Sequence, residues 1–111
     1  MNSNPPPEVH GLEVDAETRC RHWHGPTDII AIQMKCCGKF YACKDCHEAL
    51  AGHAIATWPR SEFHTPAVLC GRCRTQLPIA TYLASNSLCP NCSAHFNPRC
   101  ANHYHFYFQM E

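Results

Sequence analysis

The 111-residue sequence lacks a charge bias and a long apolar run. These two absences argue against nucleic-acid binding and against membrane insertion. Its nine acidic and nine basic residues leave a formal net charge of zero, so no long-range field attracts nucleic acid or an acidic membrane. No stretch reaches the roughly 18 apolar residues of a membrane span. The first residues have neither a basic nor an apolar region, and we therefore predict no secretory signal.

Cysteine and histidine, by contrast, are abundant. The sequence holds ten cysteines and nine histidines. Most stand in tight groups: Cys20-x-His22, Cys36-Cys37, Cys43-x2-Cys46-His47, His53, Cys70-x2-Cys73 and Cys89-x2-Cys92. The two-residue gap of a Cys-x2-Cys knuckle lets both sulfurs reach one tetrahedral zinc ion at about 2.3 Å. With so many ligand-type residues we expect little apolar core. The fold should then depend on cross-links by metal ions or disulfides.

Either zinc or disulfides would explain so many cysteines. Disulfides need an oxidising compartment, and the predicted lack of a secretory signal argues against one. Histidines recur inside the cysteine groups, where a disulfide framework has no use for them. We therefore interpret the chain as zinc-built, with a disulfide framework as the alternative.

The last two knuckles form the clearest site. Their pattern, Cys70-x2-Cys73-x15-Cys89-x2-Cys92, matches the spacing of four-cysteine zinc sites. It predicts a closed structural site, site 3, with the ligands Cys70, Cys73, Cys89 and Cys92.

The first eight ligands divide between two interleaved sites. Cys46 and His47 are neighbours, so on a helical turn their side chains diverge by about 100° and one ion does not take both. Cys46 pairs with Cys43 on the same face, which leaves His47 to another ion. We expect site 1 to comprise Cys20, His22, Cys43 and Cys46, and site 2 to comprise Cys36, Cys37, His47 and His53. Cys36 and Cys37 would face opposite ways in a strand, so site 2 requires a turn at Gly38.

A fourth set of ligand-type residues lies near the C-terminus. Cys100, His103 and His105 have a chelate spacing, and His24 would complete a site of one thiolate and three imidazoles. The alternative is a free thiol beside two surface histidines. We therefore predict three zinc ions, or four if this set binds. A fourth ion, held by a single thiolate, would be the exchangeable one.

Short elements are predicted between the ligands. Residues 1–9 are expected to form a disordered polar tail and residues 10–111 one zinc finger domain. The predicted elements are a hairpin of strands at 29–34 and 39–42, helices at 44–51 and 79–84, and a strand at 103–109. Trp58 and Phe63 offer the bulk for a second small core.

Haem attachment, thiol redox catalysis and catalytic zinc fit the sequence less well than structural zinc does. Cys43-x2-Cys46-His47 satisfies the haem-attachment pattern, but haem would leave the other cysteines unexplained. A thioredoxin-like use of the same cysteines lacks room for a βαβ fold. A catalytic zinc keeps one position open for water, whereas sites 1 to 3 each count four protein ligands. We therefore predict a protein that is not an enzyme.

The order of these groups resembles the CHY-type zinc finger family. Cys20-x-His22-Trp23, Cys36-Cys37, Cys43-x2-Cys46-His47 and the later knuckles carry the resemblance, from about His10 to the C-terminus. The twelve ligands of sites 1 to 3 fall on that family's three-zinc pattern. The resemblance implies a small, zinc-stabilised α+β fold, irregular and cross-braced, with a zinc-ribbon-like C-terminal part. Some relatives also carry a RING domain and act as ubiquitin ligases; no RING follows here, so ligase activity is not implied.

One branch of the family resembles the chain almost end to end: the short helper-of-Tim proteins of the fungal mitochondrial intermembrane space. The shared stretches are residues 21–24, 28–32, 35–37, 41–43, 96–98 and 103–108. This resemblance implies an accessory protein that assists oxidative assembly of small cysteine-rich chaperones by keeping their thiol oxidoreductase free of zinc. The expected location is the intermembrane space for a fungal source and the cytoplasm for a bacterial one. The alternative is a non-catalytic protein-interaction module with purely structural zinc.

Overall fold

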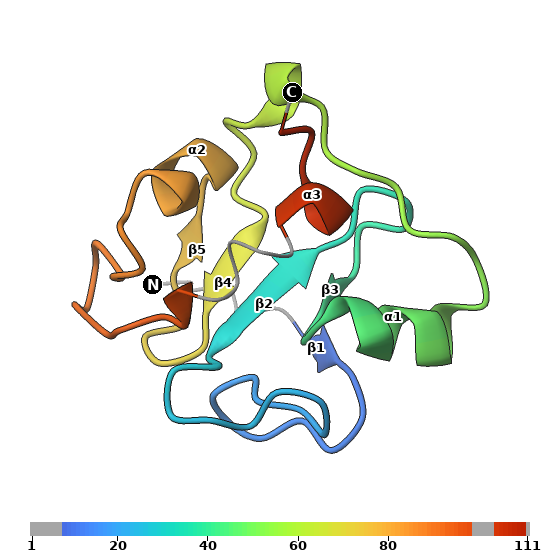
Figure 1. Cartoon of the computed structure of the whole chain (residues 1–111), viewed down its shortest axis with the longest axis horizontal. Helices are drawn as coiled ribbons and strands as arrows, with labels where there is room; N and C mark the ends of the chain where they lie inside the picture. Colours follow the sequence, from blue (N-terminus) through green and yellow to red (C-terminus); the bar gives the residue numbers. More distant parts are fainter. Residues whose placement is uncertain (1–7, 99–103, 111) are drawn as a thin grey trace, which may run out of the picture.

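The computed structural model describes residues 8–98 and 104–110, which form short strands and helices around a mixed five-stranded sheet (Figure 1). The strands are β1 (Val9–His10), β2 (Ile30–Gln33), β3 (Phe40–Tyr41), β4 (Val68–Cys70) and β5 (Gln76–Leu77). The helices are α1 (Lys44–Ala51), α2 (Ile79–Leu83), α3 (Tyr104–Tyr107) and a 3-10 turn, η1 (Arg60–Glu62). This is the small α+β class that the sequence predicted.

The sheet is built on β2, which pairs with strands on both sides. The strand order is β1-β3-β2-β4-β5. β3 runs antiparallel to β2 with Ile32 opposite Tyr41, which confirms the predicted hairpin. β1 pairs in parallel with β3, placing Val9 opposite Phe40. Val9, which we had assigned to the polar tail, is thus a strand residue. Residues 1–7 lie outside the described part of the chain, so the tail itself stays a prediction.

The two predicted helices are confirmed, and α1 begins and ends at residues suited to those positions. Cys43, in extended conformation, is the N-cap of α1, and its sulfur accepts the Cys46 N–H at 3.4 Å, as a serine oxygen does at other helix starts. The helix ends at Gly52 with φ of 72°, a left-handed conformation that glycine adopts without strain. α2 follows Pro78. α1 lies beside β3, toward the β1 end of the sheet, and α2 lies near β5 (Figure 1).

The apolar core is larger than the sequence suggested. One sheet face carries a small cluster of Ala31, Phe40 and Leu69, with Val9 against it. The other faces a contiguous core that includes Trp58, Tyr82, Phe96 and Phe108. Phe63 packs against that same core, so the second small core predicted around Trp58 and Phe63 is wrong, because both side chains belong to the main core. The expectation of little core was wrong because the ligand cysteines, as small apolar side chains, pack into it with these aromatics.

The predicted strand at 103–109 is a helix over its described part. α3 spans Tyr104–Tyr107, and Phe108 N–H bonds Tyr104 C=O at 2.8 Å. Tyr104 and Phe108 are one turn apart with their ring centroids at 6.2 Å, and both pack on the main core. The helical spacing places Tyr104 and Phe108 on the same face of the segment, so both rings reach this core. After the helix, Phe108 forms an isolated parallel bridge with Trp58, through the Trp58 N–H to Tyr107 C=O and Gln109 N–H to Trp58 C=O hydrogen bonds.

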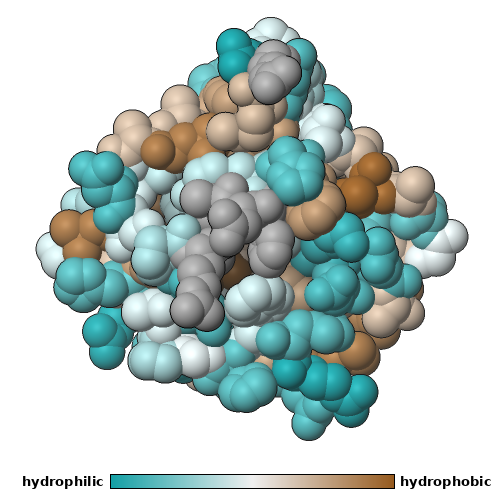
Figure 2. Space-filling model, viewed as in Figure 1, coloured by the Kyte–Doolittle hydropathy of each residue, from teal (hydrophilic) through white to brown (hydrophobic). Residues whose placement is uncertain are grey.

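The described surface has no single large apolar patch on the face shown in Figure 2, where apolar residues form separate small groups. The large exposed apolar side chains are Leu50, Leu88 and Met110, which lie on different segments. Among the described helices, none is long and apolar enough to cross a membrane.

Candidate metal centres

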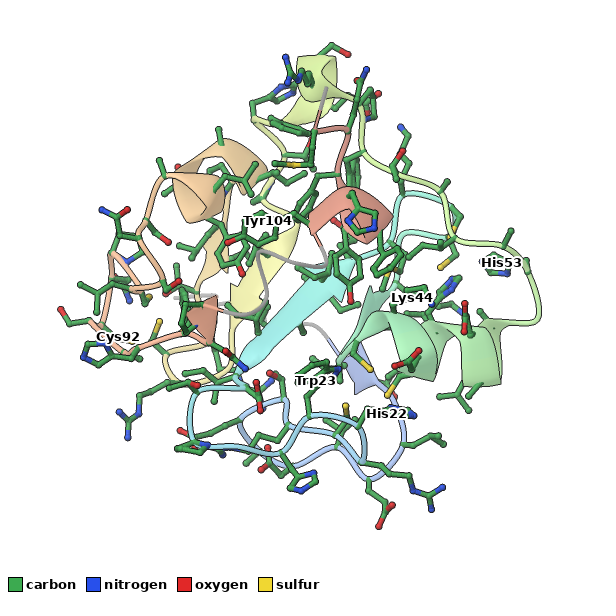
Figure 3. The ribbon with its side chains drawn as sticks, viewed as in Figure 1. His22, Trp23, Lys44, His53, Cys92 and Tyr104 are labelled. Carbon is green, nitrogen blue, oxygen red and sulfur yellow. The ribbon has the colours of Figure 1, made fainter. Side chains whose placement is uncertain are left out.

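Three groups of cysteine and histidine side chains converge, and within each group the possible ligand atoms lie within 4.8 Å of one another. Cluster 1 comprises Cys20, His22, Cys43 and Cys46; cluster 2 comprises Cys36, Cys37, His47 and His53; cluster 3 comprises Cys70, Cys73, Cys89 and Cys92. These are the residues predicted as sites 1, 2 and 3. Figure 3 shows Cys92 and His53 at opposite edges of the molecule, with His22 on the loop below α1.

Cluster 3 is made by two knuckles of nearly the same shape. In the first, Arg74 N–H bonds Cys70 C=O at 2.9 Å; in the second, Ser93 N–H bonds Cys89 C=O at 2.9 Å. Arg74 and Ser93 both have positive φ, 63° and 64°, so each knuckle closes with a left-handed residue. The first knuckle starts at the end of β4. The sheet and the second knuckle therefore bring the four sulfurs together.

Cluster 1 joins an N-terminal loop to the start of α1. Cys20 Sγ lies 3.6 Å from Cys43 Sγ, and His22 Nδ1 lies 3.4 Å from Cys43 Sγ and 3.5 Å from Cys46 Sγ. Leu12 N–H donates to Cys46 Sγ at 3.4 Å. All three sulfurs are buried, while His22 is exposed.

Cluster 2 joins the turn between β2 and β3 to α1 and to the loop that follows it. The chain turns through Cys36 and Cys37, and Gly38 N–H bonds Met34 C=O at 2.7 Å, which is the turn that two adjacent ligands require. Cys36 Sγ lies 3.3 Å from the Nε2 atoms of both His47 and His53. His47 projects from α1, whereas His53 follows the helix end.

The separations within the clusters are those of a tetrahedral zinc site. With zinc–sulfur bonds of about 2.3 Å and zinc–nitrogen bonds of about 2.05 Å, tetrahedral ligands lie about 3.8 Å apart for two sulfurs, about 3.6 Å for sulfur and nitrogen and about 3.3 Å for two nitrogens. In cluster 3 the Sγ atoms of Cys70 and Cys92 are 3.8 Å apart. In cluster 2 the two Nε2 atoms are 3.2 Å apart. The residues therefore fit the metal.

A disulfide framework does not fit the same distances. A disulfide brings two sulfurs to about 2.05 Å, whereas the close sulfur pairs are 3.6 to 4.0 Å apart. All nine cysteines in the described part of the chain are free. The disulfide alternative is therefore wrong for these nine residues.

The thiols within a cluster differ in acidity because they lie so close together. A hydrogen bond from Cys43 lowers the pKa of Cys20 to about 5, and the same contact raises the pKa of Cys43. In cluster 3, burial raises the pKa of Cys70 to about 12. For Cys73 burial acts in the same direction, but hydrogen bonds from Thr75 and Asn91 outweigh it and lower the pKa to about 6. A metal cation binds such sets by displacing the remaining protons.

The histidines of cluster 2 are prepared for binding to different degrees. Burial, together with the neighbouring His53, lowers the pKa of His47, which favours the neutral ring that binds metals. His53 Nδ1 lies 3.1 Å from Ala51 C=O, so a proton there leaves Nε2 free as the ligand atom. His47 Nδ1 is buried and has no hydrogen-bond partner among the described residues.

The predicted fourth site falls partly outside the described residues. Cys100 and His103 lie outside the residues that the structure describes. His24 and His105 are both exposed, and His24 Nδ1 lies 3.3 Å from Arg21 C=O. Within residues 8–98 and 104–110, neither histidine joins a group of three or more possible ligands. The fourth site stays a prediction.

Supporting groups around the clusters were not found from sequence. The Leu12 amide that contacts Cys46 is 34 positions away from it. The Tyr107 hydroxyl accepts the Lys44 N–H at the start of α1, across 63 positions, at 2.8 Å. Neither residue type signals such a role at its position, so only the folded chain identifies them.

Comparison with known proteins agrees with this ligand pattern. The model of the CHY zinc finger family matches residues 20–104. The chain is 44% identical to Helper of Tim protein 13 of Kluyveromyces lactis, over 94% of this chain and 90% of that protein. It is also 44% identical to Helper of Tim protein 13 of Saccharomyces cerevisiae, over 91% and 90%. An uncharacterised protein of Schizosaccharomyces pombe is 43% identical, over 91% and 88%. No solved structure matches the chain.

Proposed function

This chain belongs to the CHY zinc finger family, and we propose that it is a zinc-binding accessory protein for small cysteine-rich partner proteins. In this proposal the twelve residues of clusters 1, 2 and 3 bind three zinc ions. The protein assists the assembly of its partners, or the redox and zinc handling on which that assembly depends.

The observation that carries the proposal is the tetrahedral spacing of the twelve donor atoms. Zinc in cluster 1 would tie the loop at Cys20 to the start of α1, and zinc in cluster 3 would tie β4 to the second knuckle. Structural zinc contributes on the order of 10 kcal/mol or more per site in small domains. The protein would therefore hold three ions and present most of its thiols as metal-bound thiolates.

Zinc sites with four protein ligands support a binding role for the protein and not a catalytic one. A catalytic zinc keeps a position for water, and each cluster supplies four protein ligands. The class of partner is drawn from the relatives, since two proteins that align over nine-tenths of their length are called helpers of Tim. We place the protein, on the same basis, in the mitochondrial intermembrane space if its source is fungal.

Complementation tests this function directly. The chain would be expressed in a Saccharomyces cerevisiae strain that lacks its own Helper of Tim protein 13. The fraction of oxidised small Tim chaperones would be measured by thiol labelling and gel shift. We expect this chain to raise the oxidised fraction toward the wild-type value.

The control shows whether recovery depends on the zinc-built fold. A Cys70→Ser variant, which loses a buried ligand of cluster 3, should give no recovery. If the intact chain accumulates with its zinc bound and the oxidised fraction stays at the deletion level, the accessory role is wrong. A module that only docks on partners through inert zinc sites would then remain.

A further inference from the structure

We propose that cluster 2 is the site at which the protein exchanges zinc as a cargo with other molecules, while clusters 1 and 3 keep theirs. The identity of the receiving or donating partner rests on the proposed function. The order in which the three clusters lose zinc does not, because it is a property of the protein alone.

The sulfur atoms of cluster 2 are the most accessible of the three sets. Cluster 1 has three buried cysteines, and Cys70 and Cys89 of cluster 3 are buried too. In cluster 2, by contrast, Cys36 is exposed and Cys37 is half-buried. Its ligand His53 is exposed as well, in the loop beyond α1 at the edge of the molecule (Figure 3). An incoming ligand can therefore approach a zinc ion here from solvent.

The sulfurs of cluster 2 also lack the backbone support that the other clusters have. Backbone N–H groups donate to Cys43, Cys46 and Cys89 at 3.4 Å each. The hydrogen-bond contacts of Cys36 and Cys37, within the described residues, go only to one another and to the two histidines. A metal-bound thiolate without N–H donors keeps its charge unshared, so it is more open to attack by an incoming electrophile or metal.

The histidine ligands add a further weakness. His47 Nδ1 is buried without a partner in the described structure, although a ligating histidine ordinarily donates its second N–H, and loss of that partner costs about 10- to 100-fold in metal affinity. His53 stands just past Gly52, in residues 52–57, which form no helix or strand. Rotation about Gly52 would free this ligand without breaking the sheet.

Ligand chemistry points the same way. Cluster 2 has two thiolates, whereas cluster 1 has three and cluster 3 has four. Thiolate is the softer ligand and holds zinc more strongly than imidazole in such sites. Transfer needs no oxidant: two incoming thiols bind Zn²⁺ as thiolates, and the protons they release go to Cys36 and Cys37. Zinc keeps its charge throughout.

Stepwise chelation with residue mapping tests the assignment. The zinc-loaded protein would be titrated with EDTA below one equivalent, treated briefly with N-ethylmaleimide, and analysed by native mass spectrometry and peptide mapping. We expect molecules that have lost one zinc to carry the label on Cys36 and Cys37, while proton NMR dispersion is retained. Label present before chelation, at Cys100 for example, is subtracted.

Variants of the two exposed histidine ligands provide the matched control. His53→Cys adds a third thiolate to cluster 2 and should slow the first zinc release at least about tenfold. His22→Cys makes the equivalent change in cluster 1 and should leave the first release rate unchanged. A first loss that exposes cysteines of cluster 1, cluster 3 or Cys100, or simultaneous loss of all ions, would overturn the assignment. No partner is present in this experiment, so failure of the complementation assay leaves it intact.

Discussion

Clusters 2 and 3 lie at opposite edges of the molecule and hold their ligands in different ways (Figure 3). Cluster 3 consists of two knuckles, and each is closed by its own backbone hydrogen bond. The first knuckle starts at Cys70, the last residue of β4. Cluster 2 takes two ligands from one exposed turn, one from a helix and one from the loop after that helix. Both have four ligands, but only cluster 3 has sulfurs buried in the core.

We expect this difference to separate two uses of a four-ligand site. A buried site with supported thiolates would serve the fold, because removing its ion would leave unpaired sulfurs in the core. An exposed site with unsupported thiolates would contribute less to the fold and would be open to exchange. Three pairs of substitutions, in order of expected effect, test how far this contrast holds.

The largest effect is expected where a buried ligand is removed. Cys70 has no exposed surface, and Cys70→Ser should destabilise the protein by about 5 kcal/mol or more, because loss of a metal site is among the most costly single changes. Cys36→Ser, which makes the same change in cluster 2, should cost about 1 kcal/mol. Thermal unfolding followed by circular dichroism, with zinc counted by mass spectrometry, measures both. Equal losses of stability would remove the contrast.

A smaller effect is expected at the glycines beside the two clusters. An alanine Cβ at Gly71 would lie against the Glu17 carbonyl and 2.8 Å from that of Ile29, so Gly71→Ala should cost about 1–3 kcal/mol by overpacking. At Gly38, next to cluster 2, an added Cβ would meet no atom within 4 Å. The backbone there, however, has a positive φ of 73°. Gly38→Ala should cost about 1 kcal/mol from backbone strain. Urea unfolding compares the two, and a larger cost at Gly38 would contradict this view of the knuckle as the tighter structure.

The smallest effect tests whether α1 depends on metal alone. Tyr107→Phe removes the hydroxyl that accepts the Lys44 N–H, and we expect a loss of about 1 kcal/mol because one helix-start donor is left to water. Tyr104→Phe is the control, since the Tyr104 hydroxyl makes no hydrogen bond to the described residues and its ring should stay packed. Urea unfolding with zinc bound should separate the two variants. If Tyr104→Phe costs as much, the hydroxyl of Tyr107 does not hold α1.

The sequence alone determined which cysteines and histidines group into the three clusters, and the helix that divides two of these clusters. Cys46 and His47 follow one another on α1, so their separation between clusters 1 and 2 follows from helical geometry. The knuckle spacing of cluster 3 acts through bonds a few residues apart, and the stop of α1 at Gly52 is equally local. Such features depend on neighbours in the chain, which is why spacing predicts them.

Tertiary structure decided which clusters are sealed and what the C-terminal segment does. The alternation at 103–109 indicated a strand, but packing of Tyr104 and Phe108 against the main core made their segment helical. The Leu12 amide and the Tyr107 hydroxyl reach their partners across 34 and 63 positions. Solvent access to Cys36 and its absence at Cys70 are likewise results of packing by distant segments. No local pattern encodes such contacts, because they exist only once the whole chain has folded.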